Sequence, residues 1–311
     1  MWKKIIKKIL SNINLLNFTT SNRFIFLYHD ISEINERHHS PLYSTSIKQF
    51  KKHLELLNKI FKIIPLEELV SKKDLSSNYN YASITFDDGF YSILKNADPI
   101  LKSYNNSYTV FINGCAVISN QNWITNLQIN KEDKFYNEKI TLLSNIKNIE
   151  NNDIINTVIN KGKFNELFKD NYKINNSDRK IFLNKDDIQY LVNKKVSIQD
   201  HSFDHFVINK CNNNLLVNQI NENKKIIKEI TANNPKHFAI PFGKKIHYNQ
   251  RNILSILSQG HKYIYTTSPN RFKSKDIIKK KFLYPRIGLT NQNNNELLFF
   301  VNRAVLKNYD I

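Results

Sequence analysis

The stretch Ile84-Thr85-Phe86-Asp87-Asp88-Gly89 ends a short apolar run with two adjacent carboxylates and a glycine. Neighbouring side chains on a strand point to opposite faces, so two adjacent aspartates can have different tasks. One of them can bind a metal ion while the other faces a reacting water. Taken alone, an Asp-Asp-Gly sequence is more typical of a solvated turn, so a functional reading needs support from elsewhere in the chain.

That support comes from Asp200-His201-Ser202-Phe203-Asp204-His205, far downstream. Histidines four residues apart can reach one ion from a single turn of the chain. Two imidazoles and one carboxylate form a common open metal site. The sequence therefore predicts a metal site made by His201, His205 and one of the two aspartates.

Apolar strand-like runs alternate with helical patterns on both sides of these motifs. This spacing indicates a parallel sheet, either open or closed into a barrel. We expect strands at 23–28, 81–86, 108–112, 196–199, 238–240, 263–267 and 282–287, and helices at 46–61, 90–104, 186–193, 215–230 and 249–258. Catalytic residues gather at the carboxyl ends of such strands, and His29, Asp87, Asp88, His201 and the Pro241-Phe242-Gly243 turn all follow strand ends.

The composition is that of a folded protein and gives few clues to function. A chain of 311 residues can bury one large core or two small ones. The net charge of +19 favours an anionic partner, either a membrane surface, a nucleic acid or an acidic glycan. Cys115 and Cys211 are the only cysteines, which argues against a disulfide framework and favours a reducing compartment.

Residues 1–20 form a basic amphipathic segment ahead of the domain expected at 21–311. Within 1–18, Trp2 and several isoleucines recur at helical spacing while lysines fall on the opposite face. Two interpretations stay open: a helix that lies on an anionic membrane surface, and a helix that packs on the domain. The lysines interrupt the apolar run too often for a signal peptide. We therefore expect a cytoplasmic protein, attached peripherally to the inner face of the cell membrane in the first interpretation.

The motifs resemble those of the polysaccharide deacetylases, carbohydrate esterase family 4, which include the nodulation-factor N-deacetylase. Thr85-Phe86-Asp87-Asp88-Gly89 matches the first family motif, and His201-Ser202-Phe203-Asp204-His205 matches its H-[ST]-x-x-H motif. Phe238-Ala239-Ile240-Pro241-Phe242-Gly243 is similar to the third. Leu27-Tyr28-His29 is similar to the leading L-Y-H of one branch. Together these motifs span about residues 24–290.

The resemblance implies a distorted (β/α) barrel of about seven parallel strands, with a helical insertion after an early strand. It implies a divalent metal, usually zinc, with cobalt and nickel as alternatives. Asp87 corresponds to the catalytic base, and Asp88, His201 and His205 correspond to the metal ligands. His29 corresponds to the acid that protonates the leaving amine. A backbone N–H near Phe242 would stabilise the oxyanion, which assigns the Pro241-Phe242-Gly243 turn to substrate and oxyanion binding.

Two positions depart from the family pattern. Ala239 stands where the third motif often has an arginine that orients the base, and Arg286 is the candidate to supply that guanidinium from the last strand. Its alternative role is structural. Asp200, which precedes His201, either supports a metal ligand or is solvated. Five further histidines are expected at the surface or in the core, namely His38, His39, His237, His247 and His261.

The segment from Asn113 to Trp123 resembles a branch encoded among surface-polysaccharide and lipopolysaccharide genes, in which a helical insertion follows the third strand. The insertion at about 118–178 is then expected to cover the mouth of the active site and help select the glycan, unless it is only a spacer. The predicted function is removal of an acetyl group, N-acetyl above all, from a sugar of a cell-surface polysaccharide, lipopolysaccharide or lipid-linked glycan. Alternatives are a hydrolase of another linear or cyclic amide and a catalytically dead glycan-binding protein. No nucleic-acid partner is expected, because the lysines form no patch interleaved with aromatic residues.

Overall fold

The computed structural model describes residues 22–306, except 37, 123–124, 126–179, 274–276 and 278–281. The predicted amphipathic helix at 1–20 lies outside the described residues, as does nearly all of the insertion predicted at 118–178. Both therefore stay predictions. No helix in the described ranges combines the length and the apolar character that crossing a bilayer demands.

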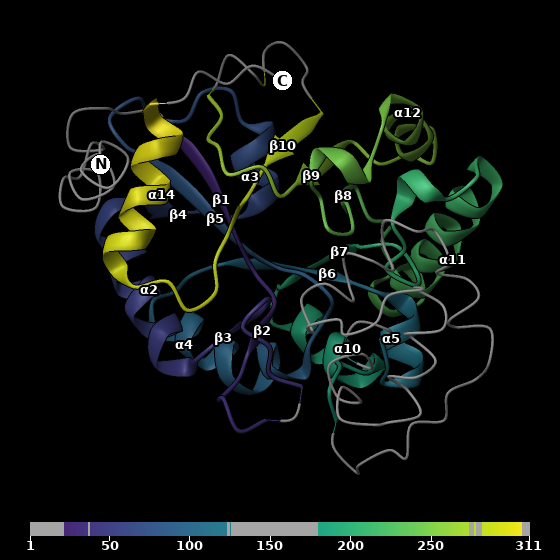
Figure 1. The fold of residues 1–311 in the computed structure, drawn as a ribbon, viewed down its shortest axis with the longest axis horizontal. Helices are drawn as coiled ribbons and strands as arrows, with labels where there is room; N and C mark the ends of the chain where they lie inside the picture. The colour runs from purple at the N-terminus through teal and green to yellow at the C-terminus, as the bar shows by residue number, and fades with distance from the viewer. Residues whose placement is uncertain are drawn as a thin grey trace, which may run out of the picture.

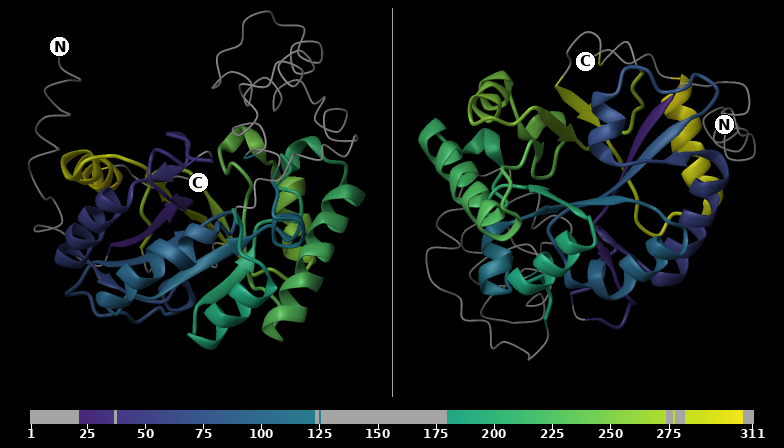
Figure 2. Two further views of the ribbon diagram at one scale, coloured as in Figure 1. Left: turned by 90° about the horizontal axis from the view of Figure 1, so that it is seen from below. Right: turned by 180° about the vertical axis from the view of Figure 1, so that it is seen from behind.

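Parallel strands form one large sheet that curves almost into a barrel (Figures 1 and 2). Neighbouring strands follow the order β10-β9-β8-β7-β6-β5-β1-β11, and β4 pairs with β5 outside this path. Their bounds are β1 Arg23–Tyr28, β4 Lys62–Ile63, β5 Tyr81–Phe86, β6 Tyr108–Ile112, β7 Ser197–Asp200, β8 His237–Ala239, β9 Tyr263–Thr266, β10 Leu283–Pro285 and β11 Ile287–Gly288. The predicted distorted (β/α) barrel is confirmed.

The first and last strands of this order, β10 and β11, belong to one short segment of the chain, and this segment brings the two edges of the sheet together. Leu283 to Pro285 pairs with β9, and Ile287 to Gly288 pairs with β1. Arg286 is the residue between the two pairings. Counted as one strand, this segment gives a ring of about seven strands, and it places the Arg286 side chain where the ring closes.

Helices cover the outside of the sheet (Figures 1 and 2). Their bounds are α2 Ile47–Ile60, α3 Leu66–Ser71, α4 Asp98–Ser103, α5 Gly114–Ser119, α10 Lys185–Asn193, α11 Asn213–Thr231, α12 Gln250–Ser258 and α14 Asn294–Leu306. All six residues of β1 are buried, because one face of the strand packs on helices and the other faces the barrel interior. Ile25, Phe111, Tyr265 and Tyr284 belong to the interior cluster.

The sequence patterns predicted the long elements and missed the short ones. The helix expected at 90–104 is a π-helix at Ile93–Ala97 followed by α4. Pro99 has no N–H to donate, and the Asp98 N–H bonds to the Ile93 carbonyl five residues back. Helices α3, α5 and α14 were not predicted, nor were β4 and the two-residue pair β2 Asp30–Ile31 and β3 Ser44–Thr45. Runs of two to six residues are too short to show a hydrophobic period. Helix α14 is the exception, because it has 13 residues and was missed despite its length.

Candidate active site

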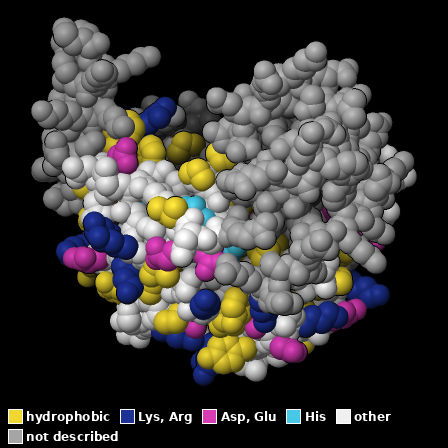
Figure 3. Space-filling view, turned by 60° about the horizontal axis from the view of Figure 1, so that its bottom comes forward, with side chains coloured by type: hydrophobic (Ala, Val, Ile, Leu, Met, Phe, Trp, Pro, Cys, Tyr) yellow, Lys and Arg dark blue, Asp and Glu magenta, His cyan; other side chains and the backbone are white. Residues whose placement is uncertain are grey.

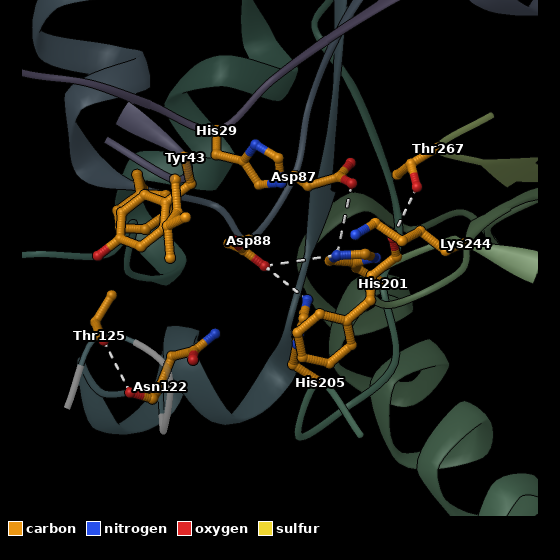
Figure 4. A pocket seen from close by; sticks show the side chains of 13 residues that line it. His29, Tyr43, Asp87, Asp88, Asn122, Thr125, His201, His205, Lys244 and Thr267 are labelled. Atoms are coloured by element: carbon orange, nitrogen blue, oxygen red, sulfur yellow. Dashed lines mark hydrogen bonds and ion pairs between the residues drawn. The ribbon is translucent and has the colours of Figure 1, made fainter. Parts of the chain in front are cut away.

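The carboxyl ends of the strands meet around a pocket of about 250 Å³. Figure 4 shows its side chains, and Figure 3 shows histidine side chains reaching the surface of this face of the molecule. Every predicted metal ligand and catalytic residue except Arg286 lines the pocket, and so does Phe242. The lining comprises His29, Leu42, Tyr43, Asp87, Asp88, Phe90, Asn122, Thr125, His201, His205, Phe242, Lys244 and Thr267.

The Asp87 carboxylate is held by two hydrogen bonds from Arg286. Both guanidinium nitrogens donate to the carboxylate, Nη1 to Oδ1 and Nη2 to Oδ2, each at 2.7 Å. Arg286 is fully buried, and its guanidinium lies 5.3 Å from the centre of the Phe111 ring. Burial alone would raise the pKa of Asp87, but the charges of Arg286 and His201 lower that pKa to about 2. Asp87 is therefore a carboxylate fixed in orientation. Arg286 supplies the guanidinium that the alanine at position 239 cannot supply.

Asp88 turns away from Asp87 because the chain bends sharply after β5. Asp88 and Gly89 both have left-handed backbone conformations, with φ of 69° and 75°. A Cβ at Gly89 would lie 3.1 Å from Cγ2 of Ile112, so glycine also provides space for this bend. The bend brings Asp88 Oδ1 to within 3.5 Å of His201 Nε2 and 3.4 Å of His205 Nε2.

The loop that carries the two histidines is held by the end of β6. The Asn113 side chain donates to the carbonyl oxygens of His201 and Ser202 at 2.6 and 3.1 Å. Ser202 and His205 have φ of 64° and 56°, and these left-handed residues coil the loop so that the two imidazole centres lie 4.8 Å apart. The motif thus needs a tightly wound loop as well as its two ligands.

Asp88, His201 and His205 can together hold one metal ion. One candidate ligand atom from each lies within 4.8 Å of the others. Asp88 Oδ1 and His201 Nε2 are buried without a hydrogen-bond partner, which fits atoms whose partner is a cation. Ligand atoms at about 2.1 Å from one tetrahedral zinc ion are separated by roughly 3.4 Å, close to the contacts observed.

The protonation states of these groups suit a cation as well. Burial, together with the neighbouring Asp87, raises the pKa of Asp88 well above its usual value, so its charge is costly without a positive partner. Burial lowers the pKa of both His201 and His205, which leaves the imidazoles neutral and able to bind metal. His201 Nδ1 lies 2.8 Å from the Ala239 carbonyl, and donation there leaves Nε2 as the ligand atom.

His29 reaches the same pocket from the end of β1 (Figure 4). Its Nδ1 is buried and has no hydrogen-bond partner. Burial lowers the pKa of His29 to about 4, although the Asp87 carboxylate acts in the opposite direction. His29 is consequently neutral at neutral pH, and an acid role requires that it gain a proton as the reaction proceeds.

The Pro241-Phe242-Gly243 turn is anchored on the end of β9. Thr267 donates from Oγ1 to the Phe242 carbonyl at 2.8 Å and from its N–H to the Gly243 carbonyl at 3.0 Å. The Gly243 N–H donates to the Pro241 carbonyl at 2.8 Å, and proline has no N–H. Neither Pro241 nor Gly243 can therefore be the backbone donor to an oxyanion, and the predicted oxyanion role applies to Phe242.

Gly243→Ala is expected to lower the free energy of unfolding by about 1–3 kcal/mol. Gly243 has φ of +63°, and a Cβ there would lie 2.7 Å from the Thr267 backbone nitrogen. Gly288→Ala is the matched control, since a Cβ at Gly288 meets nothing within 4 Å. Denaturant unfolding of both variants checks this, and equal losses of stability would contradict it.

The other histidines and Asp200 lie outside the pocket lining. His237 is buried between the Glu67 carboxylate and the Tyr265 hydroxyl, both at 2.6 Å. Asp200 is neither solvated nor bonded to the His201 ring. It accepts from the Ser202 N–H at 2.8 Å and the Asn223 amide at 2.6 Å, and its other oxygen lies 3.0 Å from His261 Nε2.

Several lining residues were not anticipated from the sequence, notably Tyr43, Lys244 and Thr267. Lys244 and Thr267 follow the ends of β8 and β9 closely, and that position was the available signal. Tyr43 precedes the two-residue strand β3 and is not at the end of a large-sheet strand, so no pattern marked it.

Comparison with known proteins agrees with this geometry. The polysaccharide deacetylase family model matches residues 75–264. No curated protein matches the sequence. Among solved structures, the Streptococcus pyogenes deacetylase PplD in complex with acetate is similar at 15% identity and a TM-score of 0.60, over 90% of this chain and 98% of that one.

IcaB from Ammonifex degensii is similar at 13% identity and a TM-score of 0.59, over 91% of this chain and 98% of that one. The de-N-acetylase from Aggregatibacter actinomycetemcomitans is similar at 15% identity and a TM-score of 0.59, over 89% of this chain and 99% of that one. At these identities the structural likeness establishes a shared fold and no more. The family match covers more than half of the sequence, and the chain belongs to the polysaccharide deacetylase family.

Proposed function

We propose that this enzyme is a metal-dependent deacetylase that removes an N-acetyl group from a sugar of a cell-surface polysaccharide, lipopolysaccharide or lipid-linked glycan. The observation that carries the proposal is the pair of adjacent aspartates with opposite surroundings. Asp87 is bound by a buried arginine, with His201 Nε2 at 3.6 Å from its Oδ2, while Asp88 faces both imidazoles and has no described arginine bound to it. A fixed carboxylate next to a metal site is suited to amide hydrolysis, because the metal activates a water and the carboxylate accepts its proton.

Each predicted metal ligand and catalytic residue then has one task. The metal, zinc in our proposal, would be held by Asp88, His201 and His205, and it supplies a water acidic enough to attack at neutral pH. Asp87 accepts the proton of the attacking water, and Arg286 keeps Asp87 ionised and fixed in orientation. The Phe242 N–H is proposed to stabilise the charge that develops on the acetyl oxygen.

His29 is proposed to protonate the leaving amine. Negative charge that develops in the pocket during attack favours the protonated imidazole, so a histidine with a low starting pKa can gain its proton at that stage. The same geometry permits attack on an acetyl ester. The N-acetyl group is proposed because one solved protein of the same fold, from Aggregatibacter actinomycetemcomitans, is a de-N-acetylase.

The purified protein is expected to contain about one divalent ion per chain, and the His201→Ala/His205→Ala double variant is expected to contain none. Removing two of three ligands leaves Asp88 alone, which is insufficient to retain an ion. Elemental analysis after incubation with zinc, cobalt or nickel and gel filtration measures this without knowledge of the substrate. His39→Ala is the control, because His39 lies outside the pocket lining. A wild type that stays empty of all three metals contradicts the proposed mechanism.

Release of acetate from acetylated glycans by the metal-loaded enzyme tests the reaction itself. Hydrolysis is expected for an N-acetylated oligosaccharide, measured as released acetate. It is not expected for linear or cyclic amides that lack a sugar, measured as released amine or ring-opened product. The reverse preference would favour the alternative amidase. Glycan binding without turnover by a metal-loaded protein would favour a binding protein.

We propose that the enzyme acts at the cytoplasmic face of the cell membrane. The support is in the sequence alone, namely the basic amphipathic residues 1–18 and the net charge of +19. Sedimentation with anionic vesicles at low salt is expected, and a full-length chain that stays in solution would contradict it.

A further inference from the structure

Lys244 is a charged residue of the pocket to which the proposed reaction gives no task. It directly follows the Pro241-Phe242-Gly243 turn and lines the pocket. Figure 4 shows its side chain extending from the loop after β8 toward the pocket. Among the lining residues that the structure describes, Lys244 is the only lysine or arginine.

The backbone at Lys244 is fixed on both sides. The Thr267 N–H donates to the Gly243 carbonyl at 3.0 Å, and the Lys244 N–H donates to His247 Nδ1 at 3.2 Å. The His247 N–H in turn donates to the Lys244 carbonyl at 2.8 Å. The flexible side chain therefore starts from a defined point at the rim of the pocket. Lys244 and Lys245 are both exposed, but only Lys244 lines the pocket.

The two carboxylates of the pocket, Asp87 and Asp88, interact with residues other than Lys244. Both oxygens of Asp87 accept from Arg286 at 2.7 Å, and Asp88 Oδ1 faces His201 and His205. Within the described ranges, no carboxylate oxygen lies within 4.0 Å of the Lys244 ammonium. A divalent ion would add further positive charge, so the loaded pocket has an excess of cations over anions.

We infer that Lys244 binds an anionic oxygen group, either a phosphate or a carboxylate, carried by the sugar residue that bears the acetyl group or by its neighbour. This inference rests on the proposed function and narrows its substrate to acidic glycans or sugar phosphates. An ammonium at the pocket rim favours an anion there through charge and hydrogen bonds, and its long side chain tolerates either group. The net charge of +19 attracts the same class of substrate from a distance.

The inference is tested by the ratio of kcat/KM for matched anionic and neutral substrates. The probes are the methyl glycoside of N-acetylglucosamine, its 6-phosphate, and N-acetylmuramic acid, which separate a phosphate from a carboxylate. The metal-loaded wild type is expected to favour at least one anionic probe by about tenfold or more. Lys244→Met is expected to bring that ratio close to one, mainly by raising KM for the anionic probe. Lys244→Arg retains the preference, and high salt weakens it.

Lys245→Met is the matched control and is expected to keep the wild-type ratio. A wild type without preference overturns the inference while the proposed function stands. So does a Lys244→Met variant that loses activity equally on neutral and anionic probes, since Lys244 would then act on the reacting group. Absence of acetate from every probe is instead a failure of the proposed function.

A second measurement decides the inference even without turnover. The metal-loaded wild type is expected to bind glucosamine 6-phosphate at least about tenfold more tightly than glucosamine by calorimetry, and Lys244→Met is expected to lose this difference. Equal affinities for the two sugars in the wild type overturn the assignment of Lys244.

Discussion

Asp87→Asn is expected to lower kcat/KM for acetate release by about 10²- to 10⁴-fold, the range that a general base contributes. Asparagine has nearly the same shape but cannot accept the proton of the attacking water. The loss should appear mainly in kcat, because Asp87 is proposed to act on the transition state and not on substrate binding. Steady-state kinetics with the metal-loaded enzyme measures the effect.

Metal content distinguishes this result from a collapsed site. Asp87 is not among the three candidate ligands, so the Asn variant is expected to retain its ion. Asp74→Asn, at an exposed position away from the pocket, is the matched control and should have wild-type activity. An Asp87→Asn variant that contains metal and stays within tenfold of wild type would show that another group is the base.

Arg286→Met is expected to reduce both stability and activity. The substitution leaves the Asp87 carboxylate buried without its positive partner, and breaking such a pair from one side costs about 3–5 kcal/mol of folding free energy. Burial then raises the pKa of Asp87, which lowers the fraction of ionised base. Denaturant unfolding and the pH dependence of kcat/KM measure the two effects.

The sign of the pH effect follows from the pKa of Asp87. It is about 2 in the folded wild type, below the value of about 3.9 for an unfolded chain. Ionisation of Asp87 therefore stabilises the fold above pH about 4, and this contribution is lost as the pH falls toward 2. In Arg286→Met, burial holds the pKa of Asp87 above its unfolded value, so ionisation of Asp87 destabilises this fold and the variant is expected to gain stability relative to wild type as the pH falls. The acidic limb of kcat/KM is expected to shift to higher pH, because the base is protonated there.

A double variant isolates the pair from a general loss of packing. Asp87→Asn/Arg286→Met removes both charges, so its destabilisation should be clearly smaller than the sum of the two single losses. Arg303→Met, at an exposed position of α14, is the control for loss of an arginine and should change stability by less than about 0.5 kcal/mol. Additive losses in the double variant would mean that Asp87 and Arg286 do not stabilise each other.

Much of this architecture could be predicted from local patterns. The strands that become β1, β5 and β6 are continuous buried runs, and their bounds agree with the predicted ones. Asp88, His201 and His205 were identified because their motifs contain the chemistry itself, with carboxylate and imidazoles at the ends of predicted strands. The amphipathic segment at 1–18 lies outside the described residues and stays a prediction.

The sequence by itself determined the strand–helix alternation, and with it which residues stand at the strand ends. Only the tertiary structure decided that Arg286 bonds to Asp87, 199 residues away, because that contact requires the barrel to close through Leu283–Gly288. The same holds for Asp200, where the burial of a carboxylate depends on Asn223 and on packing near His261. It also holds for Lys244, whose role follows from the lack of a nearby described carboxylate. Local patterns report residues close in sequence, whereas charge pairing is set by distances that exist only after folding.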